Sequence, residues 1–599
     1  MSTKRMNHTF HIPVLGLGYS IDTPLKIARF GISSVVSIVD DELIERMRKF
    51  HMEQNGERFE QIEKKKEDSR ALRITAYLNL LNRLVNKQLS KLKEEEFKEG
   101  TDLTTYFELL PEHSALKTAY LRMLQINGAE RLMIEKELKA SIQAGKIDVN
   151  IMSKVDKANY NSADEYLGDD YTDALAAMRG FANSSLNAAV IISAGLNPRL
   201  YGYMEQCACF YPDLSGLVTK KIILKVSDFR SAMIQAKMLA KKGLWVSEFR
   251  VESGLNCGGH AFATEGFLLG PILEEFKEKR AVLAKELYEM YSIVLISKGF
   301  AALTMPLQKI TAQGGIGTAE EHAFLLNYYQ LDAAGWGSPF LLVPEATNVD
   351  ENTLLRLEQA EKDDFYLSNS SPLGVLFNNF RGSTIEQQRL DRIAKGRPGS
   401  PCTKKFLCTN TEFTELPICT ASREYQHLKI KQLYEMNLTP ENHSKQFDAV
   451  TEKVCLCEGL CASAYLKNNL LKPKENKAIS ICPGPNLAYF SRKYSLKEMI
   501  NHIYGRENLL EDMSRPNLFV NELNLYVDYL KKDIASQLNE INAKQVKYFN
   551  KFKEQLMNGI NYYKRLIPEM SQYSGFCVKE MYGQLLQAEQ HLLLQPGFH

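Results

Sequence analysis

Short apolar runs alternate with helix-forming segments over the first 343 residues, and this alternation is the feature that most restricts the fold. The helical segment 23–30, for example, has Pro24 at its first turn and Gly31 at its end. The runs expected to form strands are 12–17, 33–39, 73–81, 187–195, 220–228, 244–254, 309–313 and 332–343. Such alternation is typical of a parallel α/β sheet, and about eight strands is the number that closes a (β/α)₈ TIM barrel.

The pattern changes twice along the chain, which predicts three regions. Residues 1–350 carry the barrel, interrupted by a polar, helix-forming stretch over 84–187 that we interpret as an insertion. Residues 351–494 are loop-rich and contain most of the cysteines, and residues 495–599 are largely helical. The expected fold class is therefore an α/β TIM barrel with a helical insertion and a cysteine-containing, largely helical C-terminal extension.

The bulk composition excludes several classes of partner. The chain has 44% hydrophobic and 24% charged residues and a net charge of +2, so its overall charge favours neither nucleic acid nor an anionic membrane. No apolar run reaches the ~18 residues that span a bilayer. The N-terminal stretch "MSTKRMNHTFHIP" lacks the apolar core of a secretory signal. We therefore expect a cytoplasmic protein that binds neither nucleic acid nor a membrane.

Glycines follow two neighbouring predicted strands. Gly314 and Gly315 come directly after 309–313, and Gly337 and Ser338 lie at the end of the next strand. Bare backbone N–H groups at the start of a helix can hold a phosphate, and TIM barrels commonly use their last two strands for this purpose. The alternative is that each is a plain turn between a strand and a helix.

The stretch "ESGLNCGGH" ends the predicted strand 244–254 with two glycines and an imidazole. Gly258 and Gly259 allow close approach to the backbone, and His260 carries the side chain best suited to exchange a proton near neutral pH. The alternative is a tight turn followed by a structural histidine.

Four stretches together resemble the nitronate monooxygenase (2-nitropropane dioxygenase) family of FMN-dependent (β/α)₈ barrels, which also includes flavin-dependent enoyl-acyl carrier protein reductases. The resemblance covers about residues 10–350, and the chain departs from the family pattern at Asn256-Cys257, in the insertion and in the C-terminal third. The stretches are "IPVLGLGYSIDTPLKIARFGISSVVSI", "ESGLNCGGH", "KITAQGGIGTAEEHAFLLN" and "LDAAGWGSPFL".

The resemblance implies an FMN-dependent oxidoreductase in which His260 acts as acid or base beside the flavin. It implies a flavin phosphate on Gly314, Gly315, Gly337 and Ser338, and a flavin ring against Gly16, Leu17, Gly258 and Gly259. Lys225 is a candidate to stabilise negative charge at the flavin N1–O2 edge; a surface lysine at a strand end is the alternative.

The resemblance also implies the class of partner. The substrate would be a small molecule or an acyl thioester. We expect NAD(P)H as the electron donor, or a ferredoxin-like protein if the cysteines bind an iron–sulfur cluster, and a homo-oligomer as the assembly. An enoyl-thioester reductase acting on an acyl carrier protein is an alternative, which a groove lined by Lys and Arg near residues 87–98 would favour because carriers are acidic.

Seven of the eleven cysteines fall between 402 and 482, a concentration that favours metal binding in a large intracellular chain. We expect a [4Fe-4S] cluster, rather than zinc, that relays electrons to the flavin. The expected ligands are Cys455, Cys457, Cys461 and Cys482, with Cys402, Cys408 and Cys419 as alternates. Free buried thiols are one alternative. A non-catalytic metal-binding barrel protein is another.

Overall fold

Eight parallel strands close into a barrel, each hydrogen-bonded to the next in chain order and the last to the first. The structure is a computed structural model that describes residues 7–594 except 154, 162, 164, 194, 259–264, 302–303, 402, 538–541 and 574–576. The strands are β1 (Phe10–Ile12), β2 (Ser33–Ser37), β3 (Ile147–Ile151), β4 (Ala188–Ile192), β5 (Lys220–Val226), β6 (Val246–Glu252), β7 (Lys309–Gln313) and β8 (Ala333–Gly335). The predicted TIM barrel is confirmed.

Helices surround this barrel and cover its outward-facing apolar side chains. On β6, for example, Phe249 points outward and packs against Phe276 with ring centroids 5.6 Å apart. The helices are α1 (Thr23–Ile27), α2 (Asp41–Gln54), α3 (Ser69–Glu94), α7 (Asp173–Ala182), α8 (Pro198–Glu205), α9 (Phe229–Ala240), α10 (Leu269–Ser297) and α11 (Ala319–Asn327). Within the described part of the chain, none of the helices has the length and apolar character needed to cross a bilayer.

The prediction of a third strand at 73–81 is wrong, because these residues lie inside α3. Ile74, Tyr77, Leu78 and Leu81 are buried, and their spacing of three and four residues is that of one helix face. The third strand is instead β3, within the stretch interpreted as a helical insertion. The first strand is also displaced: it covers Phe10–Ile12 and ends where 12–17 was expected to begin.

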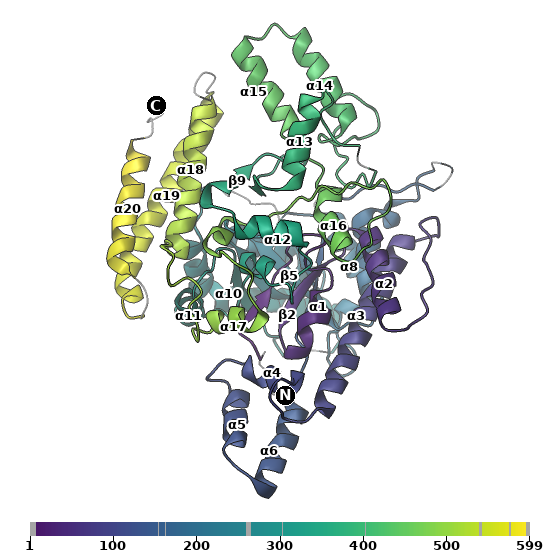
Figure 1. Cartoon of the computed structure of the whole chain (residues 1–599), viewed down its shortest axis with the longest axis vertical. Helices are drawn as coiled ribbons and strands as arrows, with labels where there is room; N and C mark the ends of the chain where they lie inside the picture. The colour runs from purple at the N-terminus through teal and green to yellow at the C-terminus, as the bar shows by residue number, and fades with distance from the viewer. Residues whose placement is uncertain are drawn as a thin grey trace.

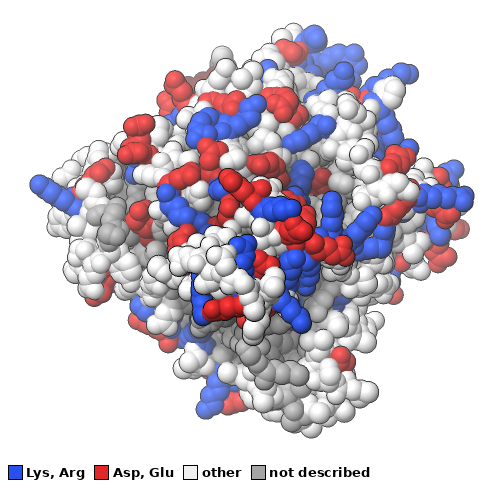
Figure 2. Space-filling view, turned by 60° about the horizontal axis from the view of Figure 1, so that its bottom comes forward, with Lys and Arg blue, Asp and Glu red and all other residues white. Residues whose placement is uncertain are grey.

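Three helices between α3 and β3 project from one end of the molecule (Figure 1). They are α4 (Asp102–Glu108), α5 (Ala115–Leu124) and α6 (Gly128–Ser141). Figure 2 brings this end forward, and on the face that it shows, basic and acidic side chains are interspersed. That face therefore presents no electrostatic field of a single sign.

The chain after β8 adds a small hairpin and nine helices among the described residues. Figure 1 shows α14 and α15 extending away from the barrel, and α18, α19 and α20 standing together along its side. The elements are α12 (Glu351–Glu358), β9 (Phe365–Ser368), β10 (Phe377–Phe380), α13 (Thr384–Ala394), α14 (Arg423–Glu435), α15 (Pro440–Thr451), α16 (Leu456–Lys467), α17 (Leu496–Ile503), α18 (Leu518–Gln537), α19 (Ala543–Met570) and α20 (Val578–Leu593).

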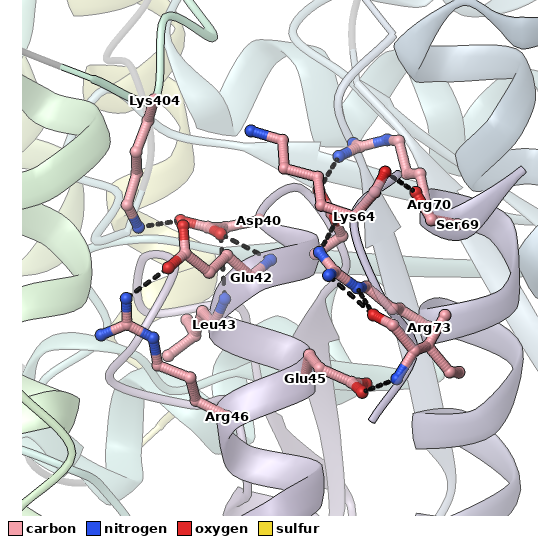
Figure 3. Close-up of polar contacts among 12 residues, drawn as sticks. Asp40, Glu42, Leu43, Glu45, Arg46, Lys64, Ser69, Arg70, Arg73 and Lys404 are labelled. Carbon is pink, nitrogen blue, oxygen red and sulfur yellow. Dashed lines mark hydrogen bonds and ion pairs between the residues drawn. The ribbon is translucent and has the colours of Figure 1, made fainter. Parts of the chain in front are cut away.

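The cysteine-containing region is fastened to the barrel at Asp40, just beyond the end of β2 (Figure 3). Asp40 is 1% exposed, and one of its carboxylate oxygens caps α2 by accepting the N–H groups of Glu42 and Leu43. Its other oxygen forms an ion pair with Lys404 and accepts the thiol of Cys461 at 3.2 Å. Removing either partner of a buried ion pair leaves an uncompensated charge, which is costly. This contact therefore fixes the cysteine-containing region against the barrel.

Candidate functional site

Charged side chains fill one side of the barrel interior. Arg250 donates to Glu248 at 2.8 Å and lies 3.5 Å from Asp148, and Thr311 also donates to Glu248 at 2.7 Å. Burial raises the pKa of Asp148 although Arg250 opposes that shift. Burial acts in the same direction on Glu248, but the charge of Arg250 and the hydrogen bonds from Thr311 and Arg250 act together against it, and the pKa is lowered. These contacts therefore favour the ionised form of Glu248.

A second polar layer lies above the first, at the carboxyl ends of β5, β6 and β7. One oxygen of Glu252, Oε1, accepts hydrogen bonds from Lys225 at 3.0 Å, Asn256 at 2.7 Å and Gln313 at 2.7 Å. The carboxyl ends of the strands form the face that carries the active site in TIM-barrel enzymes. This convergence makes the layer the candidate active site.

Three buried polar atoms at this end of the barrel lack a hydrogen-bond partner among the described residues. They are Asn256 Oδ1, beyond β6, Gln313 Oε1, at the end of β7, and Ser37 Oγ, at the end of β2. Leaving such an atom unpaired costs about 1–3 kcal/mol, so buried polar groups are normally paired with protein, water or a ligand. All three atoms therefore offer hydrogen bonds to a polar molecule in the barrel mouth.

The imidazole on β1 is unsuited to proton exchange near neutral pH. His11 is 4% exposed, and burial, assisted by the Arg250 charge, lowers its pKa to about 3. It therefore stays neutral in the physiological range.

The four residues predicted to hold a phosphate gather around a single segment, 255–257. Gly314 and Gly315 have φ of +103° and +79°, a left-handed backbone that favours glycine. A Cβ at Gly314 would lie 3.0 Å from the nitrogen of Asn256, one at Gly315 2.4 Å from Leu255, and one at Gly337 3.2 Å from Cys257. Ser338 is 4% exposed, and Gly484 of the C-terminal extension lies against its hydroxyl.

An arginine from the C-terminal region lies beside this glycine turn. Arg515 forms an ion pair with Glu321 at 2.6 Å and donates to the carbonyl of Gly315 at 2.5 Å and to Asn486 at 2.9 Å. Glu321, in the first turn of α11, also accepts the N–H of Gly317 at 2.8 Å. Arg515 thus neutralises an acidic residue that would otherwise repel an anion from this helix start.

The remaining predicted residues of the barrel mouth are differently placed. The turn after β1, with Gly16 and Leu17, lies against α16, and the N–H of Gly18 donates to Leu460 at 3.0 Å. A Cβ at Gly258 would lie 2.0 Å from the carbonyl of Val14, so the segments after β1 and β6 touch. Lys225 is held in its ion pair with Glu252 rather than exposed. Gly259 and His260 lie outside the described residues.

The four cysteines predicted as metal ligands do not share one site. Cys461 donates to Asp40 in the main core, whereas Cys455, Cys457 and Cys482 lie in a separate apolar cluster, with Cys419 at its edge. Among the described residues, no group of three or more His, Cys, Asp or Glu side chains is arranged to hold a metal ion. Cys408 is half-buried, and Cys402 is outside the described residues. The described residues thus give the iron–sulfur and zinc predictions no support.

Sequence reasoning missed Glu252 and Gln313 and treated Asn256 only as a departure from the family pattern. A signal was present for Glu252, because "VSEFRVE" carries a charge at every second position from Glu248 onward. In a strand that period of two places the charges on one face. For a strand inside a barrel, that face is the interior.

Comparison with known proteins supports no assignment. No family model matches the chain, and no curated protein does. Among solved structures, the enoyl reductase domain of MlnA from the macrolactin biosynthesis cluster of Bacillus amyloliquefaciens is similar at 14% identity and a TM-score of 0.32, covering 64% of this chain and 85% of that one. FabK from Thermotoga maritima is similar at 13% identity and a TM-score of 0.28, covering 68% and 85%. Similarity at these scores carries no argument about function.

Proposed function

We propose that this chain is an FMN-dependent oxidoreductase whose flavin lies in the barrel mouth. The observation that carries the proposal is the polar layer at the ends of β5, β6 and β7, where Lys225, Asn256 and Gln313 converge on Glu252 and Asn256 Oδ1 is left unpaired. FMN would supply the hydride or electron transfer.

The polar layer suits the edge of a flavin ring, which alternates hydrogen-bond acceptors with one N–H donor. Asn256 Oδ1 is the acceptor that such an N–H needs, and the Asn256 amide is held in place through its Nδ2 bond to Glu252. Lys225 brings a positive charge to the same edge, where it would stabilise negative charge on the reduced ring. Glu252 fixes both groups by accepting from each.

The glycine turns after β7 and β8 are the proposed phosphate site. Their support is the left-handed backbone at Gly314 and Gly315, the proximity of Gly337 and Ser338, and the Arg515 charge that offsets Glu321. Leu255 and Leu518 lie against Gly315, so the site excludes water on that side. His260, on the connection after β6, is the proposed acid or base that exchanges a proton with the substrate.

The absorption spectrum of the purified protein tests this proposal. We expect flavin bands, and we expect Gly315→Ala to lose them, because an alanine there meets Leu255 and an unfavourable φ of +79°. Gly56→Ala is the matched control: its φ is +70°, but nothing lies within 4 Å of its Cβ position, so this variant should keep the bands. A colourless wild-type protein that binds no added FMN contradicts the proposal.

A second candidate, an enoyl-thioester reductase acting on an acyl carrier protein, is favoured by one surface feature. A cavity of about 950 Å³ between α1, α2 and α3 is lined by three lysines, Lys26, Lys87 and Lys91, and by two acidic residues, Asp22 and Glu94. Lys26 is engaged by Asp22 and Asn348, which leaves Lys87 and Lys91 as the positive charges that an acidic carrier would meet.

Charge reversal separates this candidate from a reductase of free small molecules. The double variant Lys87→Glu/Lys91→Glu should raise KM for a carrier-bound enoyl thioester about tenfold or more, since like charges then oppose docking. KM for the same acyl group on free pantetheine should not change. Equal KM values for wild type and variant with both substrates would remove the carrier from the proposal.

A further inference from the structure

The C-terminal helices α18 and α19 pack against both described ends of the connection between β6 and α10, which are residues 253–258 and 265–268. At the first end, a Cβ on Gly254 would lie 2.6 Å from the hydroxyl oxygen of Tyr526. At the second, one on Gly266 would lie 2.7 Å from the carbonyl of Phe552. The first residues of α10 are held too, because the N–H of Gly270 donates to Tyr563 at 3.1 Å. Both ends therefore depend on a region more than 250 residues further along the chain.

One carboxyl group joins these two ends directly. Glu522 of α18 is 1% exposed; its Oε1 accepts the hydroxyl of Ser253 at 2.6 Å and its Oε2 accepts the N–H of Leu269 at 2.7 Å. The hydroxyl of Ser253 in turn accepts the N–H of Leu255, and the N–H of Ser253 donates to the carbonyl of Gln313. Glu522 thus links α10 to the end of β7 beside the candidate site.

We propose that Glu522 is a positioning residue, which sets the geometry of the barrel mouth by fixing both ends of the β6–α10 connection. The role rests on the proposed function only in that this connection carries His260. Glu522 touches neither substrate nor cofactor in this proposal, and it acts through Ser253 and Leu269.

The surroundings of Glu522 make the strength of its contacts with Ser253 and Leu269 depend on pH. Burial raises its pKa from 4.5 to about 7, against the hydrogen bonds from Ser253, Leu269 and Gly254 that lower it. The titratable groups that face it are the phenols of Tyr563 and Tyr329, and no Lys, Arg or His of the described residues forms an ion pair with it. Glu522 binds its proton more tightly when it is buried and bonded to Ser253 and Leu269 than when these contacts are open. The contacts are therefore most stable below pH 4.5 and weaken as pH rises to 7.

Hydrogen exchange of peptides covering 253–258 and 265–270 tests the proposal without reference to flavin or activity. In the wild type, the opening equilibrium of both ends, corrected for intrinsic exchange, should increase about tenfold or more from pH 5 to pH 8. Glu522→Gln keeps the shape and stays neutral, so its opening equilibrium should not change with pH. Asp528→Asn, at an exposed position on the same helix, should behave like the wild type.

Glu522→Ala should open both ends at every pH, because it removes the shared acceptor. Wild-type exchange that does not depend on pH, or exchange in Glu522→Gln that follows the wild-type curve, would overturn the proposal. Glu522→Gln also decides the question if Glu522→Ala fails to fold. A protein that lacks flavin but shows the expected exchange ends the FMN proposal and leaves this one standing.

Discussion

His260→Ala is expected to retain FMN and to slow turnover by about 10²–10⁴-fold, the usual contribution of a general acid or base. The proposed flavin contacts come from Lys225, Asn256 and the glycine turns, so the imidazole should contribute little to holding the cofactor. Steady-state kcat, measured with the flavin content of the same preparation, checks both parts of the expectation.

The matched control is His113→Ala, which removes an exposed imidazole from the segment between α4 and α5. It should change neither kcat nor flavin content. If His260→Ala loses its flavin together with its activity, the residue holds the site together rather than moving a proton, and unchanged turnover would exclude both roles.

Arg250→Met should lower the free energy of unfolding by about 3–5 kcal/mol, the cost of leaving buried charges without their partner. Arg250 is 2% exposed and forms ion pairs with both Glu248 and Asp148. The loss should shrink at acid pH, because protonation of the two carboxyl groups removes the uncompensated charge. Urea unfolding at pH 7 and at pH 5 measures both effects.

Neutralising all three groups provides the control for this prediction. The triple variant Asp148→Asn/Glu248→Gln/Arg250→Met should recover most of the lost stability, since no charge is then buried alone. If Arg250→Met alone is as stable as the wild type at pH 7, solvent reaches the barrel interior and screens these carboxylates.

The sequence pattern was sufficient for the barrel but not for all of its strands. Runs such as 220–228 are apolar and β-branched, as buried parallel strands usually are, and the strand β5 is found there. The third strand was missed because "IDVNI" carries Asp148 and Asn150 at alternate positions. One of them meets Arg250 inside the barrel, a partner that local patterning does not reveal.

The candidate site was predictable only where its residues follow strands. The glycines at 314, 315 and 337 follow β7 and β8, and each lies against the segment 255–257, while their role in binding a phosphate stays a prediction. Arg515 and Glu522 come from helical or loop sequence about 200 or more residues beyond β7 or β6, with no periodicity that marks them. Their positions follow from tertiary packing, which local propensity does not encode.

The barrel is synthesised well before the C-terminal residues that cover its glycine turns. At a synthesis rate of roughly 5–20 residues per second, the barrel would wait roughly 10–40 seconds after β7 emerges before Arg515 and Glu522 are made. During that interval Leu518 has not been made, so Leu255 and the glycine turn at Gly315 that it later packs against face water. Until residues 515–522 are made, this apolar surface is exposed and prone to aggregation. Chaperones that bind apolar surface would therefore protect the nascent chain most at that stage.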